Sequence, residues 1–157
     1  MKYKVIFVIT LVIVFFFESC KPRKRSLPGE VAVQEELMIA DAKFSQLSEE
    51  KGMKEAFKKY LDDSAVLLRP GNFPIRFKAE IDKFLNQEND TSFTLRWSPS
   101  YAFVSSGNDL GYTYGIYSLK PHRFDTMYYG TYTTIWKRNQ MGKWKVILDS
   151  GNEGLTK

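Results

Sequence analysis

The sequence predicts an α+β domain in which three N-terminal helices pack on a curved antiparallel sheet. Apolar residues recur at helical spacing between residues 31 and 87, and aromatic and β-branched residues alternate with polar ones between residues 91 and 152. The helical segments come first and the strands follow with short connections, which is the order of an α+β fold. The 157 residues suit one domain of ordinary size once an export segment is set aside.

Three segments of the first half are predicted to be helical. Residues 31–49 form one apolar stripe, with Asp41 on its flank, and a short second helix after Gly52 is predicted to end at Asp62-Asp63. Residues 65–68 predict a short buried strand that Arg69-Pro70-Gly71 stops. A third helix is expected over residues 78–87. The stripe of the first helix consists of Val33, Leu37, Ala40, Phe44 and Leu47.

The second half predicts a four-stranded antiparallel meander. Its strands are expected over residues 91–106, residues 110–119 and the two arms of a hairpin at 128–152, with a loop at 120–126. In the first strand Pro99 is expected to mark a bulge or an edge. Simple alternation places five apolar residues of that strand on one face: Phe93, Leu95, Trp97, Tyr101 and Phe103. In the hairpin it places Gly130, Tyr132, Thr134 and Trp136 together.

The hairpin determines what the rest of the domain must do. One face of residues 128–138 and of residues 144–149 is rich in apolar and aromatic side chains, and a two-stranded hairpin cannot bury such a face alone. The helices are therefore expected to cover it. The space that they enclose is the predicted site of any function.

The N-terminus predicts export followed by attachment to a membrane. Lys2 and Lys4 precede an apolar run at residues 5–17, which is shorter than the roughly 20 residues that cross a bilayer as a helix. The sequence Phe17-Glu18-Ser19-Cys20 resembles the bacterial lipobox, in which the cysteine is lipidated. The interpretation is a signal peptide at 1–20 ending at lipidated Cys20, a basic tether at 21–30 and one domain at 31–152. An ordinary signal peptide with an unpaired cysteine is the alternative.

This layout predicts a bacterial lipoprotein that is anchored to a membrane and faces the periplasm or the cell surface. Charge distribution argues against nucleic acid as a partner. Six of the 23 Lys and Arg residues and one of the 18 acidic residues fall within residues 1–25, which leaves 17 of each sign in the rest. A nucleic-acid surface needs basic residues gathered on one face. One cysteine and one histidine, Cys20 and His122, also argue against a metal centre, and no cofactor is predicted.

Several sequence stretches together resemble the NTF2-like superfamily, and more narrowly its exported SnoaL-like (DUF4440) proteins. They are Asp41-Ala-Lys-Phe44, Ala65-Val-Leu-Leu-Arg-Pro70, residues 109–115 and residues 134–149. The resemblance covers residues 33–152 and implies a cone of curved sheet closed by helices, often dimeric through the outer sheet face. Phe77 departs from the glycine that such proteins often have before the third helix. The superfamily includes ketosteroid isomerase, polyketide cyclases and dehydratases, so the resemblance does not by itself assign an activity.

Two carboxylates are the candidate catalytic residues. Asp41, beside the apolar stripe, and Asp149, at the end of the last strand, are the acids expected to face the interior. A carboxyl group near an apolar wall can exchange protons near neutral pH. Tyrosines would serve as hydrogen-bond donors, as in ketosteroid isomerase. The alternative is structural, with Asp41 bonded to backbone and Asp149 capping a turn at residues 149–152.

The aromatic residues with polar tips predict a pocket for a flat, partly apolar ligand. Packing in the core or at a dimer face is the alternative for each. Arg69 is interpreted as a solvated residue before a Pro-Gly turn, with contact to an anionic group as the alternative. The leading hypothesis is non-catalytic binding of a small molecule, and the alternatives are an isomerase or cyclase-like enzyme and a protein-interaction module. The candidate ligand-binding residues are Tyr60, Trp97, Tyr101, Tyr112, Tyr114, Tyr132 and Trp136.

Overall fold

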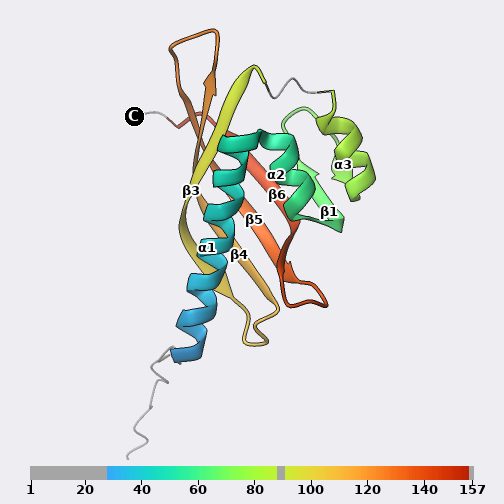
Figure 1. The fold of residues 1–157 in the computed structure, drawn as a ribbon, viewed down its shortest axis with the longest axis vertical. Helices are drawn as coiled ribbons and strands as arrows, with labels where there is room; N and C mark the ends of the chain where they lie inside the picture. The colour runs from blue at the N-terminus through green and yellow to red at the C-terminus, as the bar shows by residue number, and fades with distance from the viewer. Residues whose placement is uncertain (1–27, 88–90, 156–157) are drawn as a thin grey trace, which may run out of the picture.

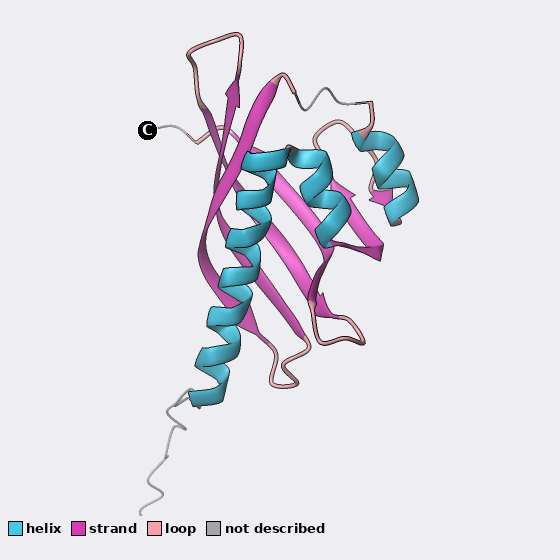
Figure 2. Ribbon diagram, viewed as in Figure 1, coloured by secondary structure: helices cyan, strands magenta, loops and turns pink. Residues whose placement is uncertain are grey.

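The computed structural model describes residues 28–87 and 91–155, and in them three helices cover one face of a strongly curved sheet (Figures 1 and 2). The signal peptide, Cys20 and most of the tether lie outside the described residues. The predicted fold class is confirmed. The helices are α1 (Pro28–Lys51), α2 (Met53–Tyr60) and α3 (Lys78–Leu85). The strands are β1 (Leu61–Leu68), β2 (Ile75–Arg76), β3 (Phe93–Val104), β4 (Leu110–Pro121), β5 (Tyr128–Arg138) and β6 (Trp144–Glu153).

The sheet has six strands in the order β2-β1-β6-β5-β4-β3. The predicted meander forms its β3–β6 part, with antiparallel pairing throughout. The prediction missed that β1 joins β6 in parallel, with Val66 opposite Leu148, and that β2 pairs with β1. The parallel pair makes the sheet mixed. The prediction missed this pair because a parallel neighbour can come from any distance along the chain and leaves no signal in local periodicity.

The predicted end of α2 at Asp62-Asp63 is wrong. The chain turns directly from helix to strand at Leu61, whose backbone is extended (φ −64°, ψ 140°) and whose side chain is buried. Both aspartates lie within β1, and the Asp62 carboxylate accepts hydrogen bonds from the backbone and hydroxyl of Ser64. Burial of Leu61 outweighs the low strand preference of the aspartates that follow.

The predicted face of β5 is confirmed. Gly130, Tyr132, Thr134 and Trp136 are all buried, whereas residues 131 and 133 are exposed. Gly130 has a specific packing reason to be glycine. A Cβ atom there would lie 2.4 Å from the ring of Tyr117 on the neighbouring strand β4. The missing side chain therefore leaves room for this tyrosine ring against strand β5.

Strand β3 changes face at a bulge. Pro99 is opposite Gly115 and Tyr101 is opposite Tyr114, which leaves Ser100 without a partner in the ladder. A single extra residue reverses the faces beyond it. Tyr101 and Phe103 are consequently exposed, and Ala102 is buried in their place. The prediction of a bulge or an edge at Pro99 agrees with this bulge in an edge strand. The prediction that Tyr101 and Phe103 share a face with Trp97 is wrong.

The core is built around Phe44 on α1, which is fully buried. Its ring centroid lies 4.7 Å from that of Trp97, 4.9 Å from that of Phe57 and 4.8 Å from that of Tyr60. Hydrogen bonds fix the same helix to β3, since the Ser45 hydroxyl lies 2.7 Å from both the N–H and the carbonyl oxygen of Trp97. The helix and the strand thus hold Trp97 in one position.

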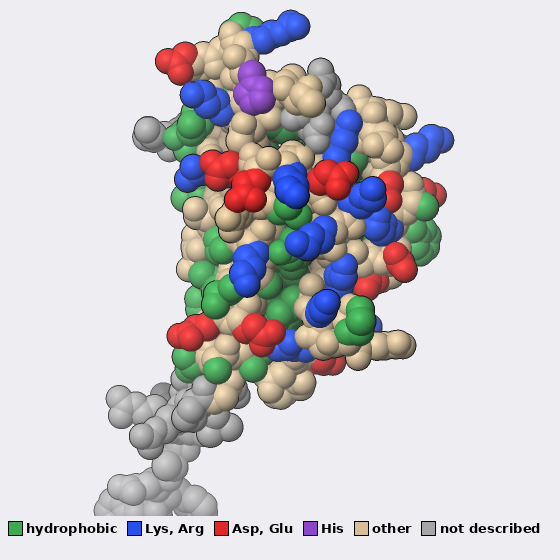
Figure 3. Space-filling model, viewed as in Figure 1, with side chains coloured by type: hydrophobic (Ala, Val, Ile, Leu, Met, Phe, Trp, Pro, Cys, Tyr) green, Lys and Arg blue, Asp and Glu red, His purple; other side chains and the backbone are tan. Residues whose placement is uncertain are grey.

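The helix-bearing surface carries charges of both signs, with Lys and Arg side chains among Asp and Glu (Figure 3). Within the part of the chain that the structure describes, no helix has the length and apolar character needed to cross a membrane. Phe77, at the start of α3, has a positive φ of 66°. Glycine adopts this backbone conformation without strain, which explains why proteins of the resembled family often have glycine here, and Phe77 adopts the same conformation despite its side chain.

Candidate functional site

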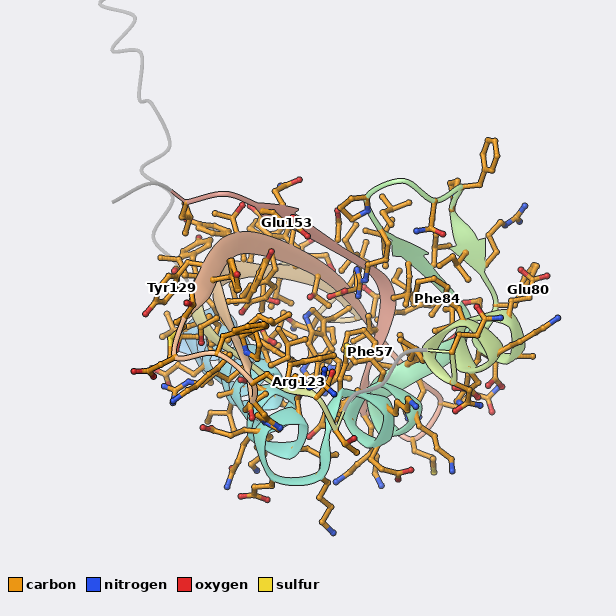
Figure 4. The ribbon with its side chains drawn as sticks, turned by 90° about the horizontal axis from the view of Figure 1, so that it is seen from above. Phe57, Glu80, Phe84, Arg123, Tyr129 and Glu153 are labelled. Atoms are coloured by element: carbon orange, nitrogen blue, oxygen red, sulfur yellow. The ribbon has the colours of Figure 1, made fainter. Side chains whose placement is uncertain are left out.

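A cavity of about 350 Å³ lies between the concave face of the sheet and helices α2 and α3. Figure 4 looks into the molecule from above and shows the curved strands on one side, the helices on the other, and Phe57 between them. Phe84 borders the cavity from α3 and Glu153 from the end of β6. The volume falls within the range of about 300–1,000 Å³ that is typical of small-molecule sites.

The cavity wall is mainly apolar and aromatic, with its polar groups supplied largely by the ends of β1 and β6. Such a wall suits a ligand that is mostly apolar and carries one polar group. The apolar and aromatic lining residues are Met53, Phe57, Pro70, Phe84, Leu85, Phe93, Leu95, Trp97, Tyr117, Leu119 and Tyr132. The others are Arg69, Asn72, Asp149, Ser150, Gly151 and Glu153.

Asp41 lies behind this wall and fixes two of its aromatic rings. Its side chain is fully buried, and it accepts a hydrogen bond from Trp97 Nε1 to Oδ1 and another from the Tyr132 hydroxyl to Oδ2, each 2.7 Å long. The Thr113 hydroxyl also hydrogen bonds to this carboxyl group. Thr113 in turn accepts a hydrogen bond of 2.9 Å from Trp136 Nε1. The network sets the orientation of both rings that face the cavity.

Burial dominates the proton affinities in this network. Desolvation raises the pKa of Asp41 above its ordinary 3.8, although hydrogen bonds from Trp97, Tyr132 and Thr113 oppose the shift. Burial, with the nearby Asp41 carboxylate, also raises the pKa of Tyr132. The tyrosine therefore stays protonated and acts as the hydrogen-bond donor to Asp41.

Asp149 lies on the cavity wall and forms an ion pair with Arg69. Arg69 Nη2 donates to Asp149 Oδ1 at 2.7 Å, and the Thr134 hydroxyl donates to Oδ2 at 2.9 Å. Asp149 is almost completely buried, and about a fifth of the Arg69 side chain is exposed. Strand β6 continues through Asp149 to Glu153, so the aspartate does not cap a turn. The interpretation of Arg69 as a solvated residue is wrong, because the parallel β1–β6 pairing brings it to this carboxylate.

The structure places three predicted site residues on the cavity wall, namely Trp97, Tyr132 and Asp149. Asp41 lies behind Trp97 and Tyr132 and does not line the cavity itself. It affects the cavity by holding these two side chains with hydrogen bonds. The two candidate carboxylates thus belong to one region of the interior. They differ in that only Asp149 is in contact with the cavity.

The other five candidate ligand-binding residues do not line this cavity. Trp136 is fully buried in the core, and Tyr60 stacks on Phe44 and borders a separate surface groove beside α1. Tyr101, Tyr112 and Tyr114 lie on the outer face of the sheet, each 39–46% exposed. In β4 the inward positions belong to Gly111, Thr113 and Gly115, so the tyrosines between them must point outward.

Sequence reasoning missed much of the aromatic wall. Phe57 and Phe93 were expected only as apolar core or strand residues, and Tyr117 was not singled out. The signal for Tyr117 was present, since it shares the inward parity of Gly111, Thr113 and Gly115. Within residues 28–87 and 91–155, no three or more His, Cys, Asp or Glu side chains come together in a way that could hold a metal ion.

No family model and no curated protein sequence matches this chain. Solved structures do share its fold. A ketosteroid isomerase-like protein from Erwinia carotovora atroseptica superposes with a TM-score of 0.64 at 14% identity, over 83% of this chain and 100% of that one. An NTF2-like protein with a cystatin-like fold from Novosphingobium aromaticivorans gives 0.61 at 14% identity, over 74% and 79%.

A structure from Catenulispora acidiphila in complex with S-DNPA gives a TM-score of 0.62 at 13% identity, over 78% of this chain and 94% of that one. Sequence identities this low establish a shared architecture and leave the chemistry open. Element order, the helix-covered curved sheet and these superpositions agree with one another. The chain therefore has the NTF2-like, cystatin-like fold.

Proposed function

We propose that this protein binds a small, partly apolar molecule in the cavity between the sheet and α2 and α3, without transforming it. The observation that carries the proposal is the 350 Å³ cavity, whose aromatic wall is held in place by Asp41 behind Trp97 and Tyr132. A wall whose rings are already fixed loses little conformational entropy when a ligand binds. The structure from Catenulispora acidiphila in complex with S-DNPA shows a fold of this shape with a bound compound.

Ligand-observed NMR with two neutral aromatic probes, indole and phenylpropionamide, tests this proposal. We expect both to bind the protein and to lose binding in Leu119→Trp, because the tryptophan would place an indole ring in the space that the ligand occupies. Leu110→Trp is the matched control, because Leu110 is exposed on the same strand and does not line the cavity. Absence of binding to the unmodified protein, or equal binding to Leu119→Trp, would contradict the proposal.

Proton-transfer catalysis is a second candidate function, and one observation favours it. The Asp149 carboxylate lies on the cavity wall, and a general base must be within reach of its substrate. Its two oxygens are already bonded to Arg69 and Thr134, which is why binding without chemistry is preferred. Isomerisation of a ketosteroid-like substrate with a pH-dependent rate, abolished by Asp149→Asn, would establish the enzyme instead.

Attachment to a bacterial membrane through lipidated Cys20 is part of the same proposal. The basic residues, apolar run and cysteine of residues 1–20 support it, and the basic tether would separate the cavity from the lipid surface. Cell fractionation of the protein and of Cys20→Ser tests it. The unmodified protein should be found with membranes and the variant should be released, whereas identical fractionation would argue against lipidation.

The proposal also includes a homodimer formed through the outer face of the sheet. Large apolar side chains gather there on β3 and β4, with 39–49% of each surface exposed, and contiguous apolar surface of this kind marks interaction sites. The same surface would serve the third alternative, a protein-interaction module. The residues of this outer patch are Tyr101, Phe103, Tyr112, Tyr114 and Ile116.

A further inference from the structure

Arg69 is the strongest hydrogen-bond donor on the cavity wall. It follows the last residue of β1, and its guanidinium carbon lies 5.6 Å from the ring centroid of Phe57, on the helix side of the cavity. Only about a fifth of its side chain is exposed. A cation placed beside an apolar surface interacts strongly with any anion that reaches it, because little water screens the pair.

The hydrogen bonds of Arg69 use only part of its donor capacity. Nη1 donates to the carbonyl oxygens of Leu68 (3.1 Å) and Asp149 (3.4 Å), and Nη2 donates to Asp149 Oδ1 (2.7 Å). A guanidinium carries five N–H groups in one plane. The bonds to Asp149 come from the two terminal nitrogens, Nη1 and Nη2. Nε–H has no acceptor among the described residues, and Nη2 uses one of its two N–H groups, so donors remain on the edge that Nε and Nη2 share.

That free edge matches a carboxylate. Two parallel N–H donors on one edge of a guanidinium bind both oxygens of a carboxylate at once, and the resulting charge-assisted bonds are about twice as strong as neutral ones. An alcohol or a ketone offers one oxygen and would fill only half of the edge. A ligand cation would meet the positive guanidinium and be repelled.

The other charges at the cavity do not compete for this role. Both oxygens of Asp149 already accept hydrogen bonds, from Arg69 and Thr134. Glu153 is exposed at the end of β6, and its carboxylate can accept hydrogen bonds but cannot donate them to an acidic ligand. The remaining wall is mainly aromatic and aliphatic. Among the described residues that line the cavity, Arg69 is therefore the one cationic side chain, and it lies beside an apolar surface.

We propose that the ligand is a compact amphipathic carboxylate, whose acid group binds the free edge of Arg69 while its apolar body fills the aromatic part of the cavity. This assignment rests on the proposed binding function and names the chemical class of the ligand. The cavity volume is near the lower end of the usual range, which favours a short aromatic or aliphatic acid over a long-chain fatty acid.

Calorimetric titration of the full chain with three probes of similar shape tests the class. The probes are phenylpropionate, phenylpropionamide and phenylpropylamine, with palmitate as a long-chain acid. We expect the compact acid to bind at least about tenfold more tightly than its amide, because a charge-assisted bond contributes more than a neutral one. Equal or tighter binding of the amide or the amine would overturn the carboxylate assignment and leave the binding function standing.

Tighter binding of palmitate than of phenylpropionate would overturn the assignment of a compact ligand. Failure of all four probes to bind would contradict the binding function as well. These outcomes separate the identity of the ligand from the existence of the site.

Variants of the ion pair give a second, independent readout. Arg69→Lys keeps the charge beside Asp149 but loses the planar donor edge, so the acid-to-amide affinity ratio should fall several-fold. Asp149→Asn removes the anion that shares the guanidinium, so the same ratio should rise. Arg96→Lys is the matched control, since Arg96 lies on the exposed surface beside Glu49 and should leave the ratio unchanged. An unchanged ratio in Arg69→Lys, or a fall in Asp149→Asn, would overturn the proposal.

Discussion

At the scale of single residues, Asp41 shows how one buried carboxyl group shapes a binding wall without lining it. The side chain is inaccessible to solvent, yet its two oxygens fix the rings of Trp97 and Tyr132, which do face the cavity. Burying a carboxylate is unfavourable unless hydrogen bonds compensate. Three donors converge on this group, which explains how a carboxyl can be accommodated at the centre of an apolar domain.

The Asp41→Asn substitution tests this account through its pH dependence. Burial raises the pKa of Asp41 above 3.8, so the folded protein keeps the proton to a higher pH than the unfolded chain. The stabilisation from this group is complete below pH 3.8 and declines as the pH rises through the raised pKa. We expect Asp41→Asn to lower the free energy of unfolding by about 1–3 kcal/mol in acid, because an amide nitrogen cannot accept a hydrogen bond, whereas both carboxyl oxygens of Asp41 do. The loss should shrink toward neutral pH.

Asp62 provides a control of opposite sign. Hydrogen bonds from Ser64 lower the pKa of its carboxyl group, so its contribution is present above pH 3.8 and is lost as the pH falls. Urea denaturation between about pH 3 and 7 should therefore show the effect of Asp62→Asn growing with pH while that of Asp41→Asn declines. An effect of Asp41→Asn that is constant or grows with pH would show that burial does not dominate at this site.

At the scale of secondary structure elements, the bulge in β3 lets one strand serve two surfaces. Before the bulge Trp97 points into the domain, and after it Tyr101 and Phe103 point out to the outer patch. If Ser100 were paired in the ladder and did not bulge, the alternation of the strand would direct Tyr101 inward toward α1. The division of β3 between the cavity wall and the outer patch therefore depends on Ser100 staying out of the ladder.

Deletion of Ser100 should change the free energy of unfolding by less than about 1 kcal/mol, because Tyr101 would follow Pro99 in a regular ladder and both Tyr101 and Ala102 would keep their observed faces. Deletion of Ala102 is the contrasting variant and should destabilise the domain by about 3 kcal/mol or more, because Phe103 would take the buried position opposite Thr113. Thermal unfolding followed by circular dichroism measures both changes. If the two deletions lower the melting temperature equally, the alternation beyond the bulge does not decide which residues are buried.

At the scale of the whole molecule, the curved sheet separates two surfaces of different chemistry. Helices cover its concave face (Figure 2), with the cavity between them and the sheet, and its convex face exposes the outer patch. An apolar patch of this kind is expected to be covered in solution. The proposed dimer would cover it and leave the cavity of each copy accessible from the helix side.

The Ile116→Lys substitution tests the dimer. Ile116 is 49% exposed within the outer patch, and a lysine there would bury a charge at the interface, so the dimer should dissociate at least about tenfold more readily. Ile39→Lys is the matched control, because Ile39 is 53% exposed on α1, away from the patch. Sedimentation velocity distinguishes the two. Unchanged sedimentation of Ile116→Lys relative to the unmodified protein would exclude this face as the interface.

Much of the fold could be predicted from local patterns. Helical spacing located α1, α2 and α3 to within a few residues, and alternation located the strands of the meander and the four residues that share one face of β5. The candidate site was predicted less completely. Trp97, Tyr132 and Asp149 were recognised, whereas Tyr101, Tyr112 and Tyr114 were predicted to bind a ligand and lie outside the sheet. Periodicity assigns residues to opposite faces without stating which face is the inner one.

The sequence by itself determined the class of the fold, the positions of its helices and most strands, and the presence of two carboxylates inside it. Only the tertiary structure decided that β1 pairs with β6, that Arg69 meets Asp149 from 80 residues away, and that Asp41 acts through Trp97 and Tyr132. The physical reason is the range of the forces involved. Burial imprints a periodic pattern on neighbouring residues, whereas strand pairing and ion pairs join groups whose separation along the chain carries no local signal.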